Sequence, residues 1–270
     1  MGELTLQSIH EIRQGNGFVF RSKDNLPVLS ADKIITDGID GLVRRKIGLS
    51  LCSGCKIGCL YCFTRNFEHF RSLTSFEIIE QAEVLLKRKG SHPGVFETKV
   101  SFKQMGDPLV NPVETLKAIE GLKNSFPDFS FVVSTSGPNC SNSFFKSLQL
   151  FSDCGVKIRL QFSCHTTSDQ ERHDLSSGVR MMNLEEVAEV VERWHGGLVT
   201  LNFVIMEGFE YQVVKIKRLF DPDKVFIKVN YLDPNSQTRR LGLKDAEMSF
   251  VKSFAKDLNA NHFRWSFRQR

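Results

Sequence analysis

Four cysteines crowd into residues 52–62. Cys55, Cys59 and Cys62 have the spacing C-x3-C-x2-C, and Cys52 precedes them. Three thiolates at this spacing can ligate three irons of a 4Fe–4S cluster and leave the fourth iron open for another ligand. A structural zinc site is the alternative, but such sites usually join two ligand pairs across a longer loop. The orientation of Cys52 is left undecided, because a side chain at a strand end can face the cluster or the core.

The other cysteines and the amino end indicate the compartment. Seven cysteines, an odd number, fit a secreted disulfide framework poorly and fit metal binding in a reducing compartment better. We expect Cys140 and Cys154 to be buried apolar cysteines. The amino end lacks a signal-peptide core, and no apolar run approaches the roughly 20 residues of a membrane helix. We therefore expect a cytoplasmic protein that does not cross a membrane.

The composition is that of a globular protein. Of 270 residues, 41% are hydrophobic and 25% are charged, which argues against disorder, fibres and coiled coils. The net charge of +5 is compatible with a nucleic-acid partner but does not require one.

From Lys46 onward, short apolar runs alternate with longer amphipathic stretches, which is typical of βαβ units and a parallel sheet. The candidate strands are residues 47–51, 98–102, 129–134, 156–162, 199–205 and 225–229. The candidate helices are residues 75–87, 112–124, 142–150, 183–194, 211–220 and 244–258, with Ser75 and Asn183 as N-caps.

This alternation predicts an α/β fold, either an open doubly wound sheet or a partial β/α barrel, because six units are too few for a closed eightfold barrel. In both architectures ligands bind at the carboxyl ends of the strands, where the cysteines lie. Residues 1–45 break the pattern with turn signals such as Gly15-Asn16-Gly17. We expect them to form a small amino-terminal appendage to a core domain of residues 46–270.

The cysteine motif, with Tyr61 directly before the last cysteine, resembles the signature of the radical S-adenosylmethionine (SAM) superfamily. The resemblance implies a partial (β/α)6 radical SAM barrel. It also implies that SAM binds the open iron through its amino and carboxylate groups. An electron then cleaves SAM to methionine and a 5′-deoxyadenosyl radical, which abstracts a hydrogen atom. The electron would come from a donor such as flavodoxin or ferredoxin.

Within the superfamily, the chain from about Gly48 is similar to the RlmN/Cfr adenosine methyltransferases, which modify adenine in RNA. Residues 104–111, QMGDPLVN, resemble that family's MGEPLLN loop. This implies that Gly106, Asp107 and Pro108 hold the amino group of SAM, with the carboxylate of Asp107 pairing with the ammonium.

Two further motifs follow at successive strand ends. The STSG motif that begins at Ser134 matches the same letters in the family and implies a SAM contact from that serine. Ser163-Cys164-His165 stands where the family has Ser-Leu-His, which implies SAM contacts from Ser163 and His165. Residues 168–186 continue in the family's register. Each motif alone is typical of a turn, so their order carries the resemblance.

The chain departs from the family at several points. Asp233, in the YLDP segment, stands where the family has a SAM-binding asparagine and implies a charged contact instead. The first 47 residues leave no room for the family's RNA-binding domain. No cysteine follows Cys164, although the family carries its transferred methyl group on a carboxyl-terminal cysteine. Cys52 is the candidate for a second family cysteine, at a different spacing.

Three functions are consistent with these features. The first is an RlmN/Cfr-like enzyme that modifies an RNA adenosine, and overall similarity favours it. The second is a radical SAM enzyme that acts on a small molecule or peptide by hydrogen abstraction without methyl transfer. The third is a non-catalytic protein with a structural or redox metal site. Residues 262–270 place arginines among aromatic residues, which suits RNA binding and a half-buried edge strand equally.

Overall fold

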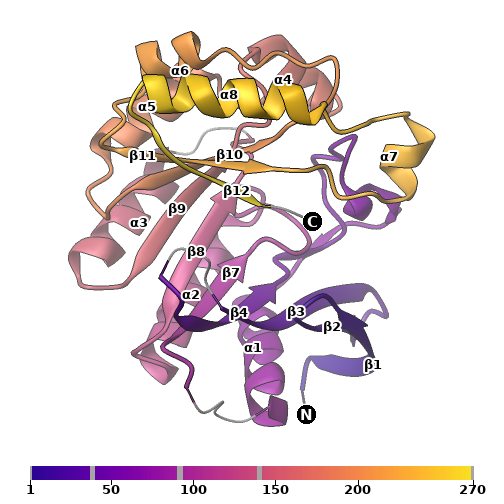
Figure 1. The fold of residues 1–270 in the computed structure, drawn as a ribbon. Helices are drawn as coiled ribbons and strands as arrows, with labels where there is room; N and C mark the ends of the chain where they lie inside the picture. The colour runs from indigo at the N-terminus through magenta and orange to yellow at the C-terminus, as the bar shows by residue number, and fades with distance from the viewer. Residues whose placement is uncertain (1, 37–39, 90–93, 139–141, 269–270) are drawn as a thin grey trace. The chain divides into compact units, whose positions relative to one another are not determined.

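A computed structural model describes residues 2–36, 40–89, 94–138 and 142–268 (Figure 1). The chain divides into two compact units. Unit 1 comprises residues 1–56, 67–134 and 146–158, and unit 2 comprises residues 57–66, 135–145 and 159–270. Cys140 lies outside the described residues.

Unit 1 contains a sheet in the order β1-β2-β3-β4-β7-β8. Its strands are β1 (Leu4–Ile12), β2 (Gly15–Ser22), β3 (Pro27–Thr36), β4 (Val43–Leu49), β7 (Glu97–Phe102) and β8 (Ser130–Thr135). The pairings from β1 to β4 are antiparallel, whereas β4, β7 and β8 are parallel. The first 45 residues are therefore mostly a three-stranded antiparallel meander that hydrogen-bonds directly to the first parallel strand.

Two helices, α1 (Ser75–Lys89) and α2 (Pro112–Ser125), pack against each other in unit 1. Fully buried side chains of β4 and β7, such as Ile47, Leu49 and Phe102, form the core. A separate two-stranded antiparallel sheet pairs β5 (Cys52–Ser53) with β6 (Arg71–Ser72). It brings together the two ends of the segment that contains the other three clustered cysteines.

Thr74, rather than Ser75, caps α1. The Thr74 hydroxyl accepts from the Glu77 backbone N–H at 3.2 Å, and the Glu77 carboxylate accepts from the Thr74 N–H at 2.9 Å. Ser75 lies inside the first turn, and its N–H is bound by the Glu114 carboxylate, so it is not the cap. The predicted cap at Asn183 is confirmed.

Unit 2 contains four parallel strands in the order β9-β10-β11-β12. These strands are β9 (Ile158–Ser163), β10 (Val199–Val204), β11 (Val225–Asn230) and β12 (Arg264–Arg268). The helices are η1 (Phe63–Asn66), α4 (Asp169–Leu175), α5 (Leu184–Arg193), α6 (Val213–Leu219), α7 (Ser236–Arg240) and α8 (Met248–Ala260), and α3 (Asn142–Asp153) begins in unit 2 and ends in unit 1.

All six predicted strands are present, and β12 is the edge strand that the alternation near the carboxyl end indicated. The short helices α4 and α7 were not predicted. Their N-caps are Ser168 and Asn235, whose side chains bind backbone N–H groups of the first turn. Cys154 is exposed, so its predicted burial was wrong, because it follows the last turn of α3. No helix in the described part of the chain is long and apolar enough to cross a membrane.

The strands of unit 2 have one apolar face and one polar face. Phe162 of β9 packs against Phe145 of α3, and Phe203 of β10 packs against Phe254 of α8. Because side chains alternate along a strand, the intervening residues lie on the other face. Ser163, the last residue of β9, is one of them.

Candidate functional site

In unit 1, backbone hydrogen bonds fix the two ends of the cysteine-bearing segment. The N–H groups of Leu51 and Cys52 both donate to the Met105 carbonyl, at 2.8 and 3.2 Å. The buried Asn111 amide donates to the carbonyls of Leu51 and Leu73, at 2.9 and 2.8 Å. One side chain therefore joins the strand entering the segment to the strand leaving it.

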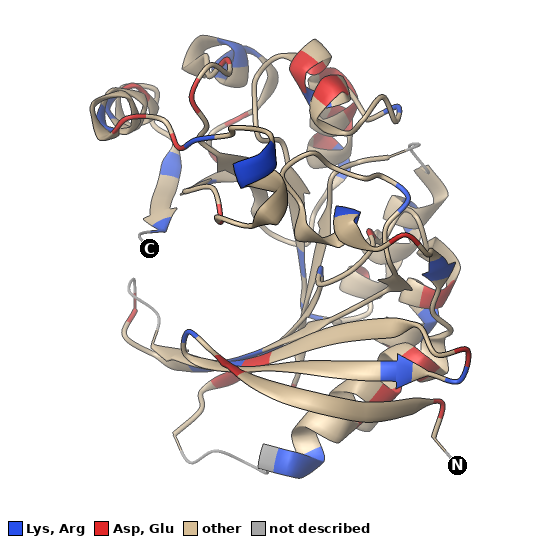
Figure 2. Ribbon diagram, turned by 90° about the vertical axis from the view of Figure 1, so that its right-hand side faces the viewer, with Lys and Arg blue, Asp and Glu red and all other residues tan. Residues whose placement is uncertain are grey.

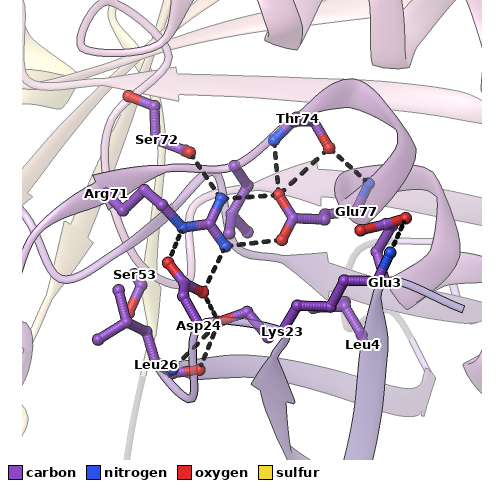
Figure 3. Close-up of polar contacts among 12 residues, drawn as sticks. Glu3, Leu4, Lys23, Asp24, Leu26, Ser53, Arg71, Ser72, Thr74 and Glu77 are labelled. Carbon is purple, nitrogen blue, oxygen red and sulfur yellow. Dashed lines mark hydrogen bonds and ion pairs between the residues drawn. The ribbon is translucent and has the colours of Figure 1, made fainter.

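Arg71 of β6 reinforces this closure through two carboxylates (Figure 3). Its Nη1 and Nη2 bind both oxygens of Glu77 at 2.9 and 2.7 Å, and its Nε lies 2.6 Å from the Asp24 carboxylate. Burial alone would raise the pKa of Glu77, but the bonds from Arg71 and Thr74 outweigh it and hold this pKa below its usual value. These ion pairs connect β6 to the start of α1 and to the β2–β3 turn.

Cys52 lies in the core of unit 1 and packs against Gly106. A Cβ atom at Gly106 would lie 2.6 Å from the Cys52 Sγ, and the φ of +85° at this position also favours glycine. Burial, together with the neighbouring Cys55 and Asp107, raises the pKa of the Cys52 thiol to about 12. Cys52 is therefore a neutral thiol at physiological pH, a poor metal ligand and a poor nucleophile.

Asp107 follows Gly106 in the loop after β7 and is buried. Its Oδ1 accepts from the Leu109 N–H at 3.0 Å, and its backbone carbonyl accepts from the Val110 N–H at 2.9 Å. The loop is thus the turn that its composition predicts. It nevertheless holds a buried carboxylate beside Cys52, and Pro108 is buried next to it.

The three candidate cluster ligands are partly exposed and form no disulfide. Cys55 belongs to unit 1, and Cys59 and Cys62 belong to unit 2. A turn holds the latter two, since the Cys62 N–H donates to the Cys59 carbonyl at 3.0 Å. Gly54 has a φ of +81°, and a Cβ there would lie 2.1 Å from the His69 carbonyl oxygen. Across the described residues, no three His, Cys, Asp or Glu side chains are grouped to hold a single metal ion.

In unit 2, two elements anchor the chain around Cys59. The Leu60 N–H donates to the Leu175 carbonyl at the end of α4, at 2.9 Å. Asn235, which also caps α7, donates from its amide to the Tyr61 carbonyl at 2.9 Å. The unpredicted helices α4 and α7 are therefore the elements that hold the backbone between Cys59 and Cys62.

A small pocket in unit 2 gathers Cys59, Tyr61, Ser163, His165 and Arg172. His165 adopts φ +63°, and its ring meets the edge of the Tyr61 ring with centroids 4.7 Å apart. Its buried Nδ1 has no hydrogen-bond partner in the part of the chain that the structure describes. Burial, assisted by repulsion from Arg172, lowers the pKa of His165 to about 3, so the imidazole is neutral.

The predicted site residues fall into two groups. Unit 1 brings Gly106 and Asp107 together beside Cys52, and unit 2 brings Ser163 and His165 together beside Cys59. Ser134 is partly buried near the end of β8. Asp233 is exposed and does not line the pocket of Ser163 and His165.

Sequence reasoning missed Arg172. This residue is buried and lines the pocket, and no described residue forms a hydrogen bond with its Nε. The available signal was its place in the stretch 168–186, which continues in the register of the RlmN/Cfr family. An arginine among the charged residues of a short helix otherwise looks like part of a solvated face.

Residues 49–220 match the sequence profile of the radical SAM superfamily. The chain belongs to this superfamily. A probable dual-specificity RNA methyltransferase RlmN from Chloroherpeton thalassium is 27% identical to it over 84% of this chain and 62% of that protein. The dual-specificity RNA methyltransferase RlmN of Campylobacter hominis is 26% identical over 81% of this radical SAM chain and 64% of its own length. The chain thus spans less than two thirds of these curated relatives.

A solved structure shows the same fold. The crystal structure of a radical SAM methyltransferase from Sphaerobacter thermophilus matches with a TM-score of 0.78 at 18% identity, over 99% of this chain and 77% of that one. The likeness confirms the predicted α/β radical SAM fold.

Membership of the radical SAM superfamily implies a 4Fe–4S cluster and SAM, and the donor set fits both. Cys55, Cys59 and Cys62 provide three partly exposed thiols in the superfamily's spacing. Two residues that line the unit 2 pocket have a buried nitrogen with no hydrogen-bond partner among the described residues, His165 at Nδ1 and Arg172 at Nε. Buried polar groups are nearly always hydrogen-bonded, so two such atoms in one pocket suit a polar ligand.

Proposed function

We propose that this protein is a radical SAM enzyme that modifies an adenosine of RNA. Cys55, Cys59 and Cys62 would hold the cluster. When bound, cluster and SAM together supply a one-electron cleavage of SAM that yields a hydrogen-abstracting radical. The reaction needs a donor such as flavodoxin or ferredoxin, and a reducing compartment such as the cytoplasm would keep the thiols reduced.

The remaining site residues would bind and orient SAM. Asp107, buried beside Gly106, would pair with the SAM ammonium through a charge-assisted bond. The Ser163 hydroxyl and the neutral His165 imidazole would offer hydrogen bonds from the unit 2 pocket. For Ser134, Pro108 and Asp233, the proposal rests on the family resemblance.

The polar face of the unit 2 sheet is the observation that supports an RNA substrate. In register across the strands, this face carries Arg159, Gln161, Ser163, Thr200, Asn202, Val204, Phe226, Lys228, Asn230, Arg264, Ser266 and Arg268. Four of these side chains are cationic and none is acidic, and Figure 2 shows the basic residues at both ends of β12. A parallel sheet covered on both faces is apolar on both, so this face suits a polyanionic partner.

Anaerobic product analysis tests the proposal. Reconstituted, reduced protein is incubated with methyl-labelled SAM, with and without ribosomal or transfer RNA, and a Cys59→Ala variant serves as the control. We expect 5′-deoxyadenosine to form and labelled adenosine to appear in the RNA only with the wild-type protein. RNA that stays unmodified while SAM is cleaved would contradict the RNA substrate.

RNA affinity at varied salt tests the cationic face. Replacing Lys228 and Arg264 together with Gln should reduce the slope of log affinity against log salt by about 1.4, since each phosphate contact on single-stranded RNA contributes about 0.7. The matched control replaces Lys252 and Lys256, two exposed lysines of α8, with Gln. An equal change in the control would show that only net charge matters.

The burial of two cysteine thiols favours a second function. Cys52 and Cys164 are both buried, and burial raises the pKa of Cys164 to about 11. Neither thiol is suited to carry a methyl group, which favours hydrogen abstraction from a small molecule or peptide. This second function predicts no S-methylcysteine at either position in peptide mass spectra after incubation with labelled SAM. A methylated Cys52 or Cys164 would contradict the second function and support methyl transfer to RNA.

A further inference from the structure

Arg172 of α4 connects three loops of unit 2. Its side chain is only 3% exposed. Nη1 donates to the Cys164 carbonyl at 2.9 Å, and Nη2 donates to the Met182 carbonyl at 3.0 Å. Nη2 also makes a longer contact of 3.5 Å to the Ser136 carbonyl. One guanidinium therefore bridges backbone oxygens from segments that are distant in the sequence.

Two of these loops carry predicted SAM contacts. Cys164 lies between Ser163 and His165, so its carbonyl belongs to the backbone that orients both side chains. The third loop is joined to the segment after β8 by a separate bond, in which the Met182 N–H donates to the Gly137 carbonyl at 2.7 Å. Removing the guanidinium would take away the bond to the Cys164 carbonyl and would leave the bonds from the N–H groups of Cys164 and His165 to the Asn202 carbonyl, at 2.9 and 3.2 Å, in place.

The charge of Arg172 is only partly compensated. The Asp169 carboxylate lies 3.8 Å from Nε, beyond hydrogen-bond distance, and Asp169 is 45% exposed. The partners of the Nη groups are carbonyl oxygens, which carry only partial negative charge. Buried arginines are normally paired with a carboxylate. The carboxylate partner of Arg172 is the partly exposed Asp169, and Arg172 lines a pocket that also contains Ser163 and His165.

We propose that Arg172 is a positioning residue for SAM. It fixes the backbone at Cys164 relative to the loops of Ser136 and Met182, and so holds Ser163 and His165 in the arrangement that binds SAM. The planar guanidinium suits this task because several rigidly oriented N–H groups can bind carbonyls in different directions. This inference rests on the proposed use of SAM by the enzyme.

SAM affinity of the anaerobically reconstituted protein, measured by equilibrium dialysis without turnover, tests this role. Arg172→Met should raise the SAM dissociation constant about tenfold or more, which is the loss expected for a charged hydrogen-bonding group. Arg172→Lys keeps the charge and can bind fewer carbonyls, so it should give an intermediate value. It also decides the question if the methionine variant does not fold.

The matched control is Arg45, another buried arginine, which pairs with Asp32 at 2.9 Å in unit 1. Arg45→Met should lower the unfolding temperature while leaving SAM affinity within about twofold of wild type. SAM binding by both Arg172 variants within twofold of wild type would overturn the positioning role. An equal loss of affinity in Arg45→Met would also overturn it, because the effect would then follow from stability. If the wild-type protein binds no SAM, the proposed function itself fails.

Discussion

The two arginines Arg71 and Arg172 are held in different ways. Arg71, in unit 1, is bound by the carboxylates of Glu77 and Asp24, so its charge is neutralised where it lies. Arg172, in unit 2, donates from its Nη groups to carbonyl oxygens, and its Nε lies 3.8 Å from the partly exposed carboxylate of Asp169. An arginine that is paired with carboxylates connects chain segments, and its positive charge is neutralised. An arginine that is bound mainly by carbonyl oxygens also connects chain segments, but its positive charge can still attract a ligand.

The largest effect is expected for the three cysteines that are proposed to hold the cluster. Replacing Cys55, Cys59 and Cys62 together with Ala should abolish iron binding, because all three irons lose their protein ligand. Anaerobically reconstituted wild-type protein should contain about four irons and four sulfides per chain. Iron and sulfide analysis with visible absorption measures both proteins, and a Cys154→Ala variant controls for loss of an exposed thiol. A full cluster in the triple variant would show that these three cysteines are not the cluster ligands.

At the proposed SAM site, Asp107→Asn keeps the size of the buried side chain and removes its charge. SAM binding should weaken by about 1.5 to 3 kcal/mol, the usual contribution of a hydrogen bond to a charged group. Calorimetric titration of the reconstituted protein measures the loss. Asp128→Asn, at an exposed position of the same unit, should bind SAM like the wild type. Unchanged affinity in Asp107→Asn would exclude this carboxylate from SAM binding.

The ion pair between Arg71 and Glu77 should make the stability of the fold depend on pH. The folded-state pKa of Glu77 is lowered below its ordinary value of 4.5. A depressed carboxyl pKa stabilises the fold above the unfolded value, and this stability is lost as pH falls below about 4.5. Glu77→Gln should lower the free energy of unfolding by about 1 to 3 kcal/mol at pH 7 and should lose less stability than wild type on acidification. Urea unfolding at pH 7, 5 and 4 measures both effects.

Glu80→Gln, on the same helix, serves as the control for the charge change. Its carboxylate accepts from the N–H groups of Glu3 and Leu4 at the edge of β1, so it should affect the amino end of the chain and not β6. If wild type and Glu77→Gln show the same pH dependence, the ion pair with Arg71 contributes nothing measurable to stability.

The alternation of apolar runs was sufficient to predict the parallel strands, since a buried strand and an amphipathic helix have different periods. The helices α4 and α7 were not predictable in this way, because their sequences, DQERHDL and SQTRR, contain too few apolar residues to show a period. Their caps at Ser168 and Asn235 were visible, but such residues are equally common in turns.

At the site, the cysteine spacing and the loop motifs indicated Cys59, Asp107, Ser163 and His165 as candidates. The sequence could not tell whether Cys52 faces the cluster or the core. That depends on the tight approach of Gly106, which is 54 residues further along the chain and sets the space available to the Sγ. The role of Arg172 was not predictable for a similar reason, since its partners are backbone carbonyls, which every residue type has.

The short β5–β6 pairing affects how the proposed cluster would be inserted. It joins the ends of residues 54–70 through bonds between protein groups alone. Closing a flexible loop of this length costs about 2 to 3 kcal/mol of chain entropy. Since the folded polypeptide already meets this cost, an incoming iron–sulfur unit does not have to organise the loop ends. For the proposed cluster of Cys55, Cys59 and Cys62, insertion can therefore follow folding of the chain.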